Sequence, residues 1–410
     1  MKHVIVVGGG LAGLSTVEAL RAQGYEGELT LLGAEPHEPY DRPPLTKEVL
    51  AGDADDPTLP ADWERLGCRL RLGMRAEGLR LHDGRPGGVV RTATGALEFD
   101  ALVIATGATP VRLPGEGPQH VVRSLDDARV VRAALREGAR VVVVGAGWIG
   151  AEVATVAAAR GCRVTVLESA DTPLAEVVGP EIGALTAAWY AEAGVELHCG
   201  VRVASVDHGG VTLADGRFVP ADTVVVGVGV RPEVGWLAGS GLPVERGVVV
   251  DGSMRTARPE VVAVGDCAAW WSHRYGRRLL VEHWDSALNA PKVAAASLLG
   301  GDAVYDPAPY FWSQQFGRTV QYAGHHSAPE RMVFRSSADG AGWAALWLDG
   351  DRLEAILTVD RPRDMVQGRR LIADGAALDV ALLPDPDVPL RDTAHPRTTR
   401  TAPSHGSPRP

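Results

Sequence analysis

The sequence Val4-Ile5-Val6-Val7-Gly8-Gly9-Gly10-Leu11-Ala12-Gly13 places a run of β-branched residues directly before a glycine-rich turn. A continuous apolar run of this kind is typical of a strand that is buried on both faces of a parallel sheet. The helical spacing of Leu14, Val17 and Leu20 predicts a helix over 14–23, and residues 29–32 predict the next strand. The first 35 residues therefore predict a strand–helix–strand unit.

The same arrangement returns further along the chain. Residues 140–144 predict a second buried strand, and the turn Gly145-Ala146-Gly147-Trp148-Ile149-Gly150 follows it. A helix over 151–160 and a strand over 163–167 complete this second unit. The separation of the two turns along the sequence fits two dinucleotide-binding domains and not an internal repeat within one domain.

A glycine turn between a strand and a helix is suited to a pyrophosphate. The first glycine permits the tight turn, the second lets the phosphate approach the backbone, and the third lets helix and strand pack closely. The helix N-terminus also favours the negative charge of the phosphates. We therefore expect cofactor contacts at Gly8, Gly10 and Gly13 of the first turn, and at Gly145, Gly147 and Gly150 of the second.

Two dinucleotide sites without a dithiol indicate that electrons pass from one cofactor to the other and then outward. A nicotinamide delivers a hydride, whereas a flavin accepts the electron pair and can release electrons singly. We therefore expect FAD in the first site and NADH in the second.

The residue that ends the second strand of each unit selects the nucleotide. In the second unit this is Glu168, because a carboxylate there accepts both ribose hydroxyls and repels a 2′-phosphate. Residues 169–172 include no arginine that would receive such a phosphate, so the sequence predicts NADH over NADPH. A solvated helix-capping role for Glu168 is the alternative. In the first unit Glu35 is the nearest carboxylate, and we expect it at the FAD ribose.

Composition excludes other classes of protein. The net charge of −10 disfavours nucleic acid and anionic membranes as partners. The four cysteines lie far apart with no C-x-x-C motif, so we expect neither a zinc site nor a redox-active dithiol, and a cytoplasmic chain with reduced thiols. No apolar run is long enough to cross a membrane. His325 and His326 are adjacent and would face opposite sides of a strand, so no metal site is expected.

Lysine is rare in this chain. The 41 basic residues include three lysines, Lys2, Lys47 and Lys292, so a site that needs a compact ammonium would stand out. A drift of the whole composition toward arginine explains the same bias equally well.

The remaining strand-like runs extend the pattern toward the C-terminus. Their residue ranges are 101–104, 223–226, 248–250 and 261–264. Beyond about residue 307 tryptophan and tyrosine cluster, and the alternating stretch 343–347 indicates an antiparallel sheet. Residues 391–410 are rich in Pro, Ser, Thr and Arg and are expected to be a disordered tail.

Several motifs together resemble one family. The first glycine turn is followed by Pro39-Tyr40-Asp41-Arg42-Pro43-Pro44-Leu45-Thr46-Lys47, and later come Ala105-Thr106-Gly107, Ala263-Val264-Gly265-Asp266-Cys267-Ala268 and Tyr310-Phe311-Trp312-Ser313-Gln314-Gln315. With the two glycine turns, these resemble the FAD-dependent NADH:ferredoxin reductases of oxygenase systems. That family includes the putidaredoxin, rubredoxin and Rieske dioxygenase ferredoxin reductases. The resemblance covers residues 1 to about 390.

The resemblance implies roles for particular residues. Lys47 matches the lysine beside flavin N5, Glu152 matches the acid that pairs with it, and Trp312 matches an aromatic on the route toward the iron–sulfur partner. Positions implied at the FAD site are Leu11, Ala12, Arg42, Ala76, Thr106, Gly107, Arg123, Gly265, Asp266 and Trp284. Positions implied at the NADH site are Trp148, Ile149 and Gly229. A surface location for Lys47 and plain core packing for Trp312 are the alternatives.

Two positions depart from the family pattern. The family often has an acid at the position of Ala34, so the FAD ribose would be held by Glu35 or by backbone. Gln314 replaces an acid of the usual Trp-Ser-Asp-Gln motif, which removes a charge near the expected electron exit.

The resemblance implies an α/β fold of the glutathione-reductase-like class with two Rossmann-like domains. The FAD domain is expected over 1–112 and 243–307, an inserted NADH domain over 113–242, and an α+β interface domain over 308–390. The implied activity is electron transfer from NADH through FAD to a 2Fe-2S ferredoxin or rubredoxin, by a monomer or weak homodimer. An NADH oxidase, peroxidase or disulfide reductase would need a redox cysteine within 39–48, which is absent. A regulatory flavoprotein that binds NADH is the other alternative.

Overall fold

The computed structural model describes residues 1–326, 331–337, 340 and 342–395 of the chain. Contacts between residues divide it into two compact units, residues 1–319 and residues from 320 onward. Each unit is described by itself below. Among the described residues, no helix combines the length and the apolar composition that a membrane span requires.

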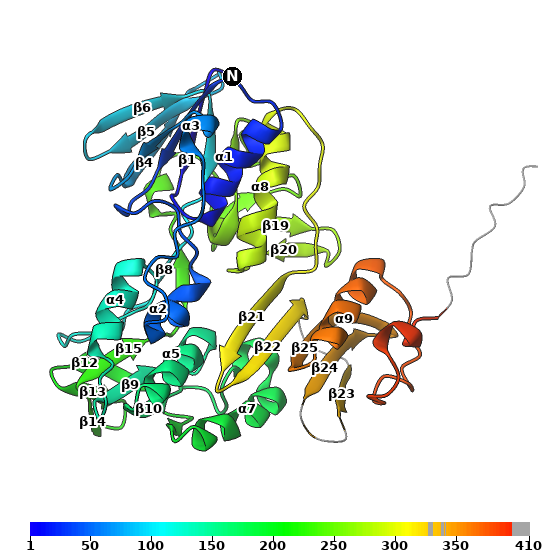
Figure 1. Ribbon diagram of the computed structural model, residues 1–410. Helices are drawn as coiled ribbons and strands as arrows, with labels where there is room; N and C mark the ends of the chain where they lie inside the picture. Colours follow the sequence, from blue (N-terminus) through cyan, green and yellow to red (C-terminus); the bar gives the residue numbers. More distant parts are fainter. Residues whose placement is uncertain (327–330, 338–339, 341, 396–410) are drawn as a thin grey trace, which may run out of the picture. The chain divides into compact units, whose positions relative to one another are not determined.

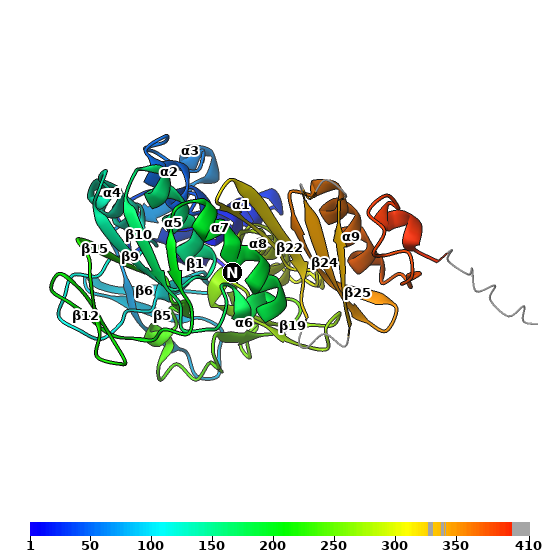
Figure 2. The ribbon, with the colours of Figure 1, turned by 90° about the horizontal axis from the view of Figure 1, so that it is seen from below.

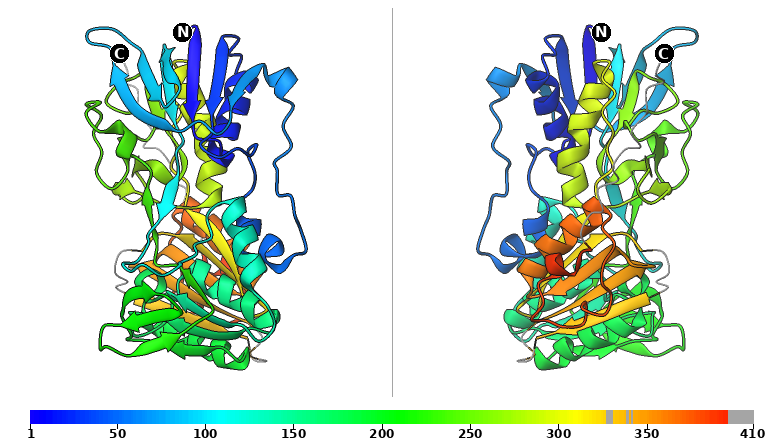
Figure 3. Two further views of the ribbon diagram at one scale, coloured as in Figure 1. Left: turned by 90° about the vertical axis from the view of Figure 1, so that its left-hand side faces the viewer. Right: turned by 90° about the vertical axis from the view of Figure 1, so that its right-hand side faces the viewer.

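The central sheet of the first unit is parallel and has the strand order β18-β7-β1-β2-β3. In that order the strands are Val261–Ala263, Ala101–Ile104, His3–Val7, Glu28–Leu32 and Cys68–Arg71. Helices α1 (Leu11–Ala22) and α8 (Trp284–Leu298) pack against each other beside it (Figure 3). The apolar strand run that opens the chain therefore lies at the middle of the sheet.

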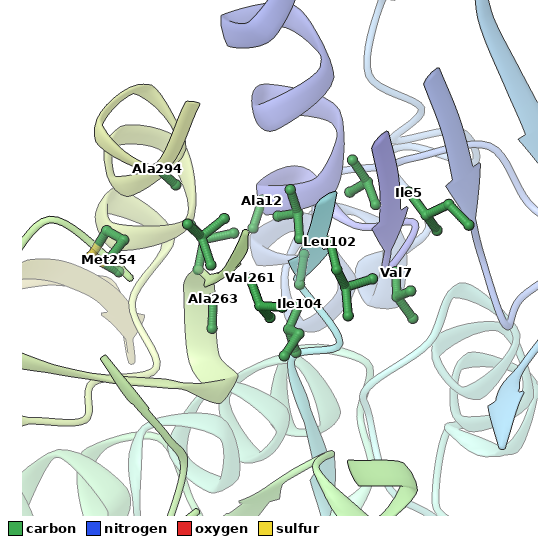
Figure 4. Packing of buried hydrophobic residues seen from close by; sticks show 14 of the residues in the cluster. Ile5, Val7, Ala12, Leu102, Ile104, Met254, Val261, Ala263 and Ala294 are labelled. Carbon is green, nitrogen blue, oxygen red and sulfur yellow. The ribbon is translucent and has the colours of Figure 1, made fainter. Parts of the chain in front are cut away.

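The core of this sheet is made of the β-branched and aliphatic side chains that the strand runs supply. Ile5 and Val7 from β1, and Leu102 and Ile104 from β7, are almost completely buried. Figure 4 shows them in one cluster with Ala12, which comes from α1, and Ala294, which comes from α8. Small alanines on the helices let the backbones lie close to the sheet, which holds the glycine turn at the strand ends.

A second parallel sheet, with the order β11-β10-β9-β15, lies in the middle of the sequence. Its strands are Glu196–His198, Arg163–Leu167, Arg140–Val144 and Thr223–Val226, and Figure 2 shows β10, β9 and β15 beside α5. The helices are α4 (Leu125–Ala134), α5 (Trp148–Ala159), α6 (Ala175–Val178) and α7 (Pro180–Glu192). The antiparallel strands β12 (Val203–Asp207), β13 (Gly210–Leu213) and β14 (Phe218–Pro220) form a small separate sheet.

The two parallel sheets are joined by a pair of short antiparallel strands, β8 (Ala108–Pro110) and β16 (Val230–Pro232). The chain therefore leaves the first sheet after β7, builds the second sheet, and returns through β16 to complete the first with β18. This crossing is what the expected insertion of one dinucleotide domain into the other requires.

The other elements of the first unit are short (Figure 1). One antiparallel sheet contains β4 (Ala76–Leu81), β5 (Gly88–Thr92) and β6 (Gly95–Phe99). Another contains β17 (Val248–Val250), β19 (Ala268–Ser272) and β20 (Arg277–Leu279), with β17 parallel to β19. The short helices are η1 (Pro43–Thr46), α2 (Glu48–Ala51), α3 (Trp63–Leu66), η2 (Gly235–Leu237) and η3 (Gly265–Cys267), and β21 (Tyr310–Gln315) comes last.

The second unit is an antiparallel sheet with one helix. Its strand order is β22-β25-β24-β23, and the strands are Arg318–Gly324, Arg352–Val359, Trp343–Asp349 and Arg331–Ser336. Helix α9 (Pro362–Asp374) packs on β25, and η4 (Leu390–Thr393) packs on α9. The antiparallel sheet expected from residues 343–347 is confirmed.

Most predicted strands are confirmed, but both glycine-motif helices start one turn earlier than predicted. Helix α1 begins at Leu11 and α5 at Trp148, and neither has a side-chain cap on its N-terminal glycine. The prediction relied on apolar spacing, and a start without a capping side chain gives no sequence signal. Strands β9 and β10 match their predicted bounds, β1 and β2 each begin one residue earlier than predicted, and β18 ends one residue earlier than predicted.

The expected tail begins too early. Leu390 and Thr393 are buried, the Thr393 hydroxyl donates to the Leu390 carbonyl, and the His395 N–H donates to the carbonyl of Ala377. Residues 391–395 are therefore folded against the second unit. The remainder of the expected tail, 396–410, lies outside the described residues. The expected domain bounds stay a prediction; within the first unit, Ser313 and Gln314 of β21 bond to Glu152 of α5.

Candidate functional site

The first glycine turn has two closed positions and one open position. A Cβ on Gly8 would lie 2.0 Å from the Ala105 carbonyl oxygen, and one on Gly13 would lie 1.9 Å from the Gly8 carbonyl oxygen. At Gly10 no atom of the described residues lies within 4 Å of the added Cβ. The outer glycines are therefore required by packing, whereas Gly10 leaves room for a phosphate at the start of α1, where Leu11 and Ala12 follow.

The second glycine turn repeats this geometry. A Cβ on Gly145 would lie 2.5 Å from the Gly227 carbonyl oxygen, and one on Gly150 would lie 2.0 Å from the Gly145 carbonyl oxygen. Gly147, directly before Trp148 and Ile149, again has no atom of the described residues within 4 Å of an added Cβ. Both turns thus fit the pyrophosphate that the sequence predicts for them.

Glu168 lies where a ribose-binding acid is expected. One carboxylate oxygen accepts the Ala146 N–H of the glycine turn at 2.6 Å, and the other accepts the Ala170 N–H at 2.8 Å. The side chain therefore spans from the end of β10 to the turn and carries a negative charge beside it. Gly229, the other position implied at this site, begins the return toward β16 and has an open Cβ position.

Glu35 is already bound by its own chain. Its carboxylate accepts the Tyr40 hydroxyl at 2.5 Å and the Arg42 guanidinium at 2.8 Å. Arg42 also donates to the carbonyl oxygen of Arg123. Burial raises the pKa of Tyr40, which keeps its hydroxyl protonated as a donor to Glu35. The assignment of Glu35 to the FAD ribose stays a prediction, and the same carboxylate also orders the loop that follows β2.

Three loops meet at the carboxyl edge of the first sheet. Gly8 follows β1, and Thr106 and Gly107 follow β7. Gly265 begins η3, two residues after the end of β18. Arg123 reaches into this edge and donates to Asp266 at 2.9 Å. Ligands of parallel α/β sheets bind outside the carboxyl ends of the strands, so these residues lie where a cofactor is expected. Ala76 begins β4, in the neighbouring antiparallel sheet.

Lys47 and Glu152 form a buried ion pair, as the resemblance implies. The Lys47 ammonium lies 2.8 Å from Glu152, with 11% and 4% of the two side chains exposed. Glu152 also accepts the hydroxyls of Thr46 and Ser313. Sequence reasoning missed these two hydroxyls, although each is adjacent to a residue that the resemblance singles out.

Two tryptophans are brought together from segments far apart in the sequence. Trp284, at the start of α8, and Trp312, on β21, contact edge to face with ring centroids 5.7 Å apart. The Trp284 indole donates to Asp41 at 2.6 Å, and Tyr310 stacks beside Trp312 at 6.2 Å. The sequence did not single out Asp41 or Phe311, and Phe311 contacts both Trp148 and His283.

The comparisons with known proteins agree with this geometry. Residues 2–291 match the pyridine nucleotide-disulphide oxidoreductase family, and residues 310–394 match the reductase C-terminal family. The chain is 38% identical over 409 residues to the ferredoxin reductase component of chlorobenzene dioxygenase from Cupriavidus sp. (strain PS12), covering 95% of this chain and 97% of that protein. It is 34% identical to putidaredoxin reductase from Pseudomonas putida, covering 95% and 96%.

The chain belongs to the FAD-dependent ferredoxin reductase family. Among solved structures, Fdr9 superposes with a TM-score of 0.91 at 48% identity, covering 97% of this chain and 100% of that chain. The putidaredoxin reductase–putidaredoxin complex superposes with a TM-score of 0.89 at 32% identity, covering 96% and 98%. The reductase uses FAD and NAD(H), and the two open glycine positions and the Lys47–Glu152 pair fit these cofactors.

Proposed function

We propose that this reductase transfers electrons from NADH to a 2Fe-2S ferredoxin, or a rubredoxin, that serves an oxygenase in the cytoplasm. The observation that carries the proposal is the pairing of two dinucleotide turns with the buried Lys47–Glu152 pair. Trp312, directly before the serine that bonds Glu152, offers an aromatic surface beside the same site. The proposal extends to this chain what the names of its relatives state of them.

The residues of the chain supply position and charge. Gly10 and Gly147 admit the pyrophosphates to the helix N-termini, while Arg123 and Asp266 lie at the carboxyl edge of the first sheet. Lys47 places a positive charge in a site from which water is largely excluded, so it acts strongly on charge that develops nearby. When bound, FAD takes up electrons in pairs from NADH and passes them on singly, which no side chain can do.

The cysteines disfavour the dithiol alternative. Burial is the largest cause that raises the pKa of all four thiols, and for Cys68 it raises the pKa to about 11. A redox cysteine must be available as its thiolate, so these positions are poorly suited to disulfide or peroxide chemistry.

The test is a panel of acceptors. We expect NADH-dependent reduction of cytochrome c to depend on an added 2Fe-2S ferredoxin or rubredoxin, because the proposed route passes electrons from the flavin to that protein first. If NADH oxidation is slow and no ferredoxin in the panel is reduced, the regulatory flavoprotein alternative replaces the proposal. Fast oxidation of NADH by oxygen without any acceptor protein would support an oxidase instead.

A further inference from the structure

The carboxylate of Glu152 divides its two oxygens between two distant segments of the chain. Oε2 accepts the Lys47 ammonium at 2.8 Å and the Thr46 hydroxyl at 2.5 Å, both from the segment around η1. Oε1 accepts the Ser313 hydroxyl at 2.7 Å and the Gln314 N–H at 3.2 Å, both from β21. A buried carboxylate needs several donors to remain charged, and Glu152 receives them from both sides.

Ser313 has a defined hydroxyl direction. Its oxygen accepts the Gln315 side-chain amide at 3.1 Å, so its single proton is directed to Glu152. Ser313 and Gln315 are each 1% exposed, so both bonds are shielded from bulk solvent. A chain of hydrogen bonds therefore runs from Gln315 through Ser313 to Glu152 and then to Lys47.

We propose that Ser313, oriented by Gln315, is a positioning residue that holds Glu152 and thereby Lys47 in place. This inference rests on the proposed function, because it takes Lys47 to act beside the flavin. Because Ser313 follows Trp312 directly on β21, the strand expected to face the acceptor protein is tied through Glu152 to Lys47, whose positive charge is expected beside the flavin. Without the Ser313 hydroxyl, Oε1 keeps one weaker donor, and Glu152 can turn away from Lys47.

The scarcity of lysine makes a direct test possible. The chain has three lysines, so acylation of Lys47 by trace acetic anhydride is measured by mass spectrometry against Lys2 and Lys292 in the same FAD-loaded sample. An ammonium held by a carboxylate acylates slowly, since the reaction needs the free amine. We expect Ser313→Ala to raise the relative labelling of Lys47 about fivefold, as the loss of one hydrogen bond would do.

Three further variants distinguish a specific effect of Ser313 on the position of Lys47 from a general loosening of the fold. Ser313→Thr keeps the hydroxyl and should restore the wild-type labelling of Lys47. Ser297→Ala removes another buried serine hydroxyl of the same unit, which bonds the Ser253 carbonyl and not Glu152, and should leave the labelling unchanged. Gln315→Met should raise the labelling in the same direction as Ser313→Ala by a smaller factor, and it serves if Ser313→Ala fails to fold.

Equal or slower labelling of Lys47 in folded Ser313→Ala and Gln315→Met would overturn the inference. The same result in Ser297→Ala as in Ser313→Ala would also overturn it, because the effect would then be general. Labelling requires no ferredoxin, so failure of the acceptor panel with a positive labelling result would count against the proposed function alone.

Discussion

The Glu168 carboxylate bonds two stretches of backbone, the second glycine turn and the residues that follow β10. Its two oxygens accept N–H groups from Ala146 and Ala170, so the carboxylate is held in one orientation where an adenosine ribose is expected. A fixed negative charge repels a 2′-phosphate more strongly than a mobile one does. We therefore propose that Glu168 is the residue that sets a preference for NADH over NADPH.

We expect Glu168→Gln to reduce the preference for NADH over NADPH by about tenfold in kcat/KM, because the amide keeps the shape but not the charge. The measurement is steady-state kinetics with both coenzymes. The control is Glu196→Gln, which removes a charge from the exposed end of β11 without a contact to the turn. Comparable efficiency of the wild-type protein with NADH and NADPH would contradict this assignment.

Single residues of the site could be predicted only where their type was informative. Lys47 and Glu152 were singled out by the resemblance to the reductase family, and the rarity of lysine in this chain favoured a specific role for Lys47. Thr46 and Ser313 were not, because their importance comes from a hydrogen bond to a residue more than one hundred positions away. Such a bond depends on how segments are brought together, and the sequence pattern around either residue does not record it.

Within the first glycine turn, packing and ligand access act at different positions. Gly13 lies inside α1, where alanine is normally preferred by about 1 kcal/mol, yet a Cβ there would collide with the Gly8 carbonyl. Gly10 precedes the helix with an ordinary negative φ of −99° and an open Cβ position. Gly13 is therefore the glycine that packing requires, and Gly10 is the glycine that leaves room for the cofactor.

We expect Gly13→Ala to lower the free energy of unfolding by about 1–3 kcal/mol, because overpacking outweighs helix propensity. Gly10→Ala should change the stability of the apoprotein by less than about 0.5 kcal/mol but should weaken FAD retention. Urea unfolding of the apoprotein and titration with FAD measure the two effects. If both substitutions destabilised the apoprotein equally, the assignment of Gly13 to helix packing and of Gly10 to cofactor access would be wrong.

Element boundaries show a similar division. The predicted strands were largely correct since a buried parallel strand is a continuous apolar run that stops at a turn residue. The starts of α1 and α5 were placed one turn too late, because the residue that precedes each helix is a glycine, which has no side chain to cap the helix. At the other end, 391–395 are polar in sequence but fold, since Leu390 and Thr393 are buried.

At the scale of whole units, the second unit carries a histidine that should make its stability depend on pH. His326 stacks on the buried Trp347 with ring centroids 4.3 Å apart and bonds the Tyr322 hydroxyl. Burial, and to a lesser degree the neighbouring His325, lowers the pKa of His326 to about 4. Between pH 6.5 and 4 the unfolded chain therefore binds a proton at this position that the folded chain does not.

We expect the free energy of unfolding to fall as pH decreases from about 6.5 toward 4, because protonation favours the unfolded state over this window. His326→Gln should flatten the slope, as glutamine does not titrate. Thermal unfolding at a series of pH values measures it, with the exposed His208→Gln as the control. A slope unchanged by His326→Gln would mean that His326 is not the group responsible.

The two strand–turn–helix units, the cofactors and the family could be identified from the sequence, because each depends on short contiguous patterns. A buried strand, a glycine turn and the acid that follows the next strand lie close together in the chain, and local geometry fixes their spacing. Only the tertiary structure decided what surrounds Glu152, since its donors come from η1 and β21, which lie on opposite sides of it in sequence. Burial separates that carboxylate from bulk water, so its hydrogen bonds come from donors that folding alone assembles.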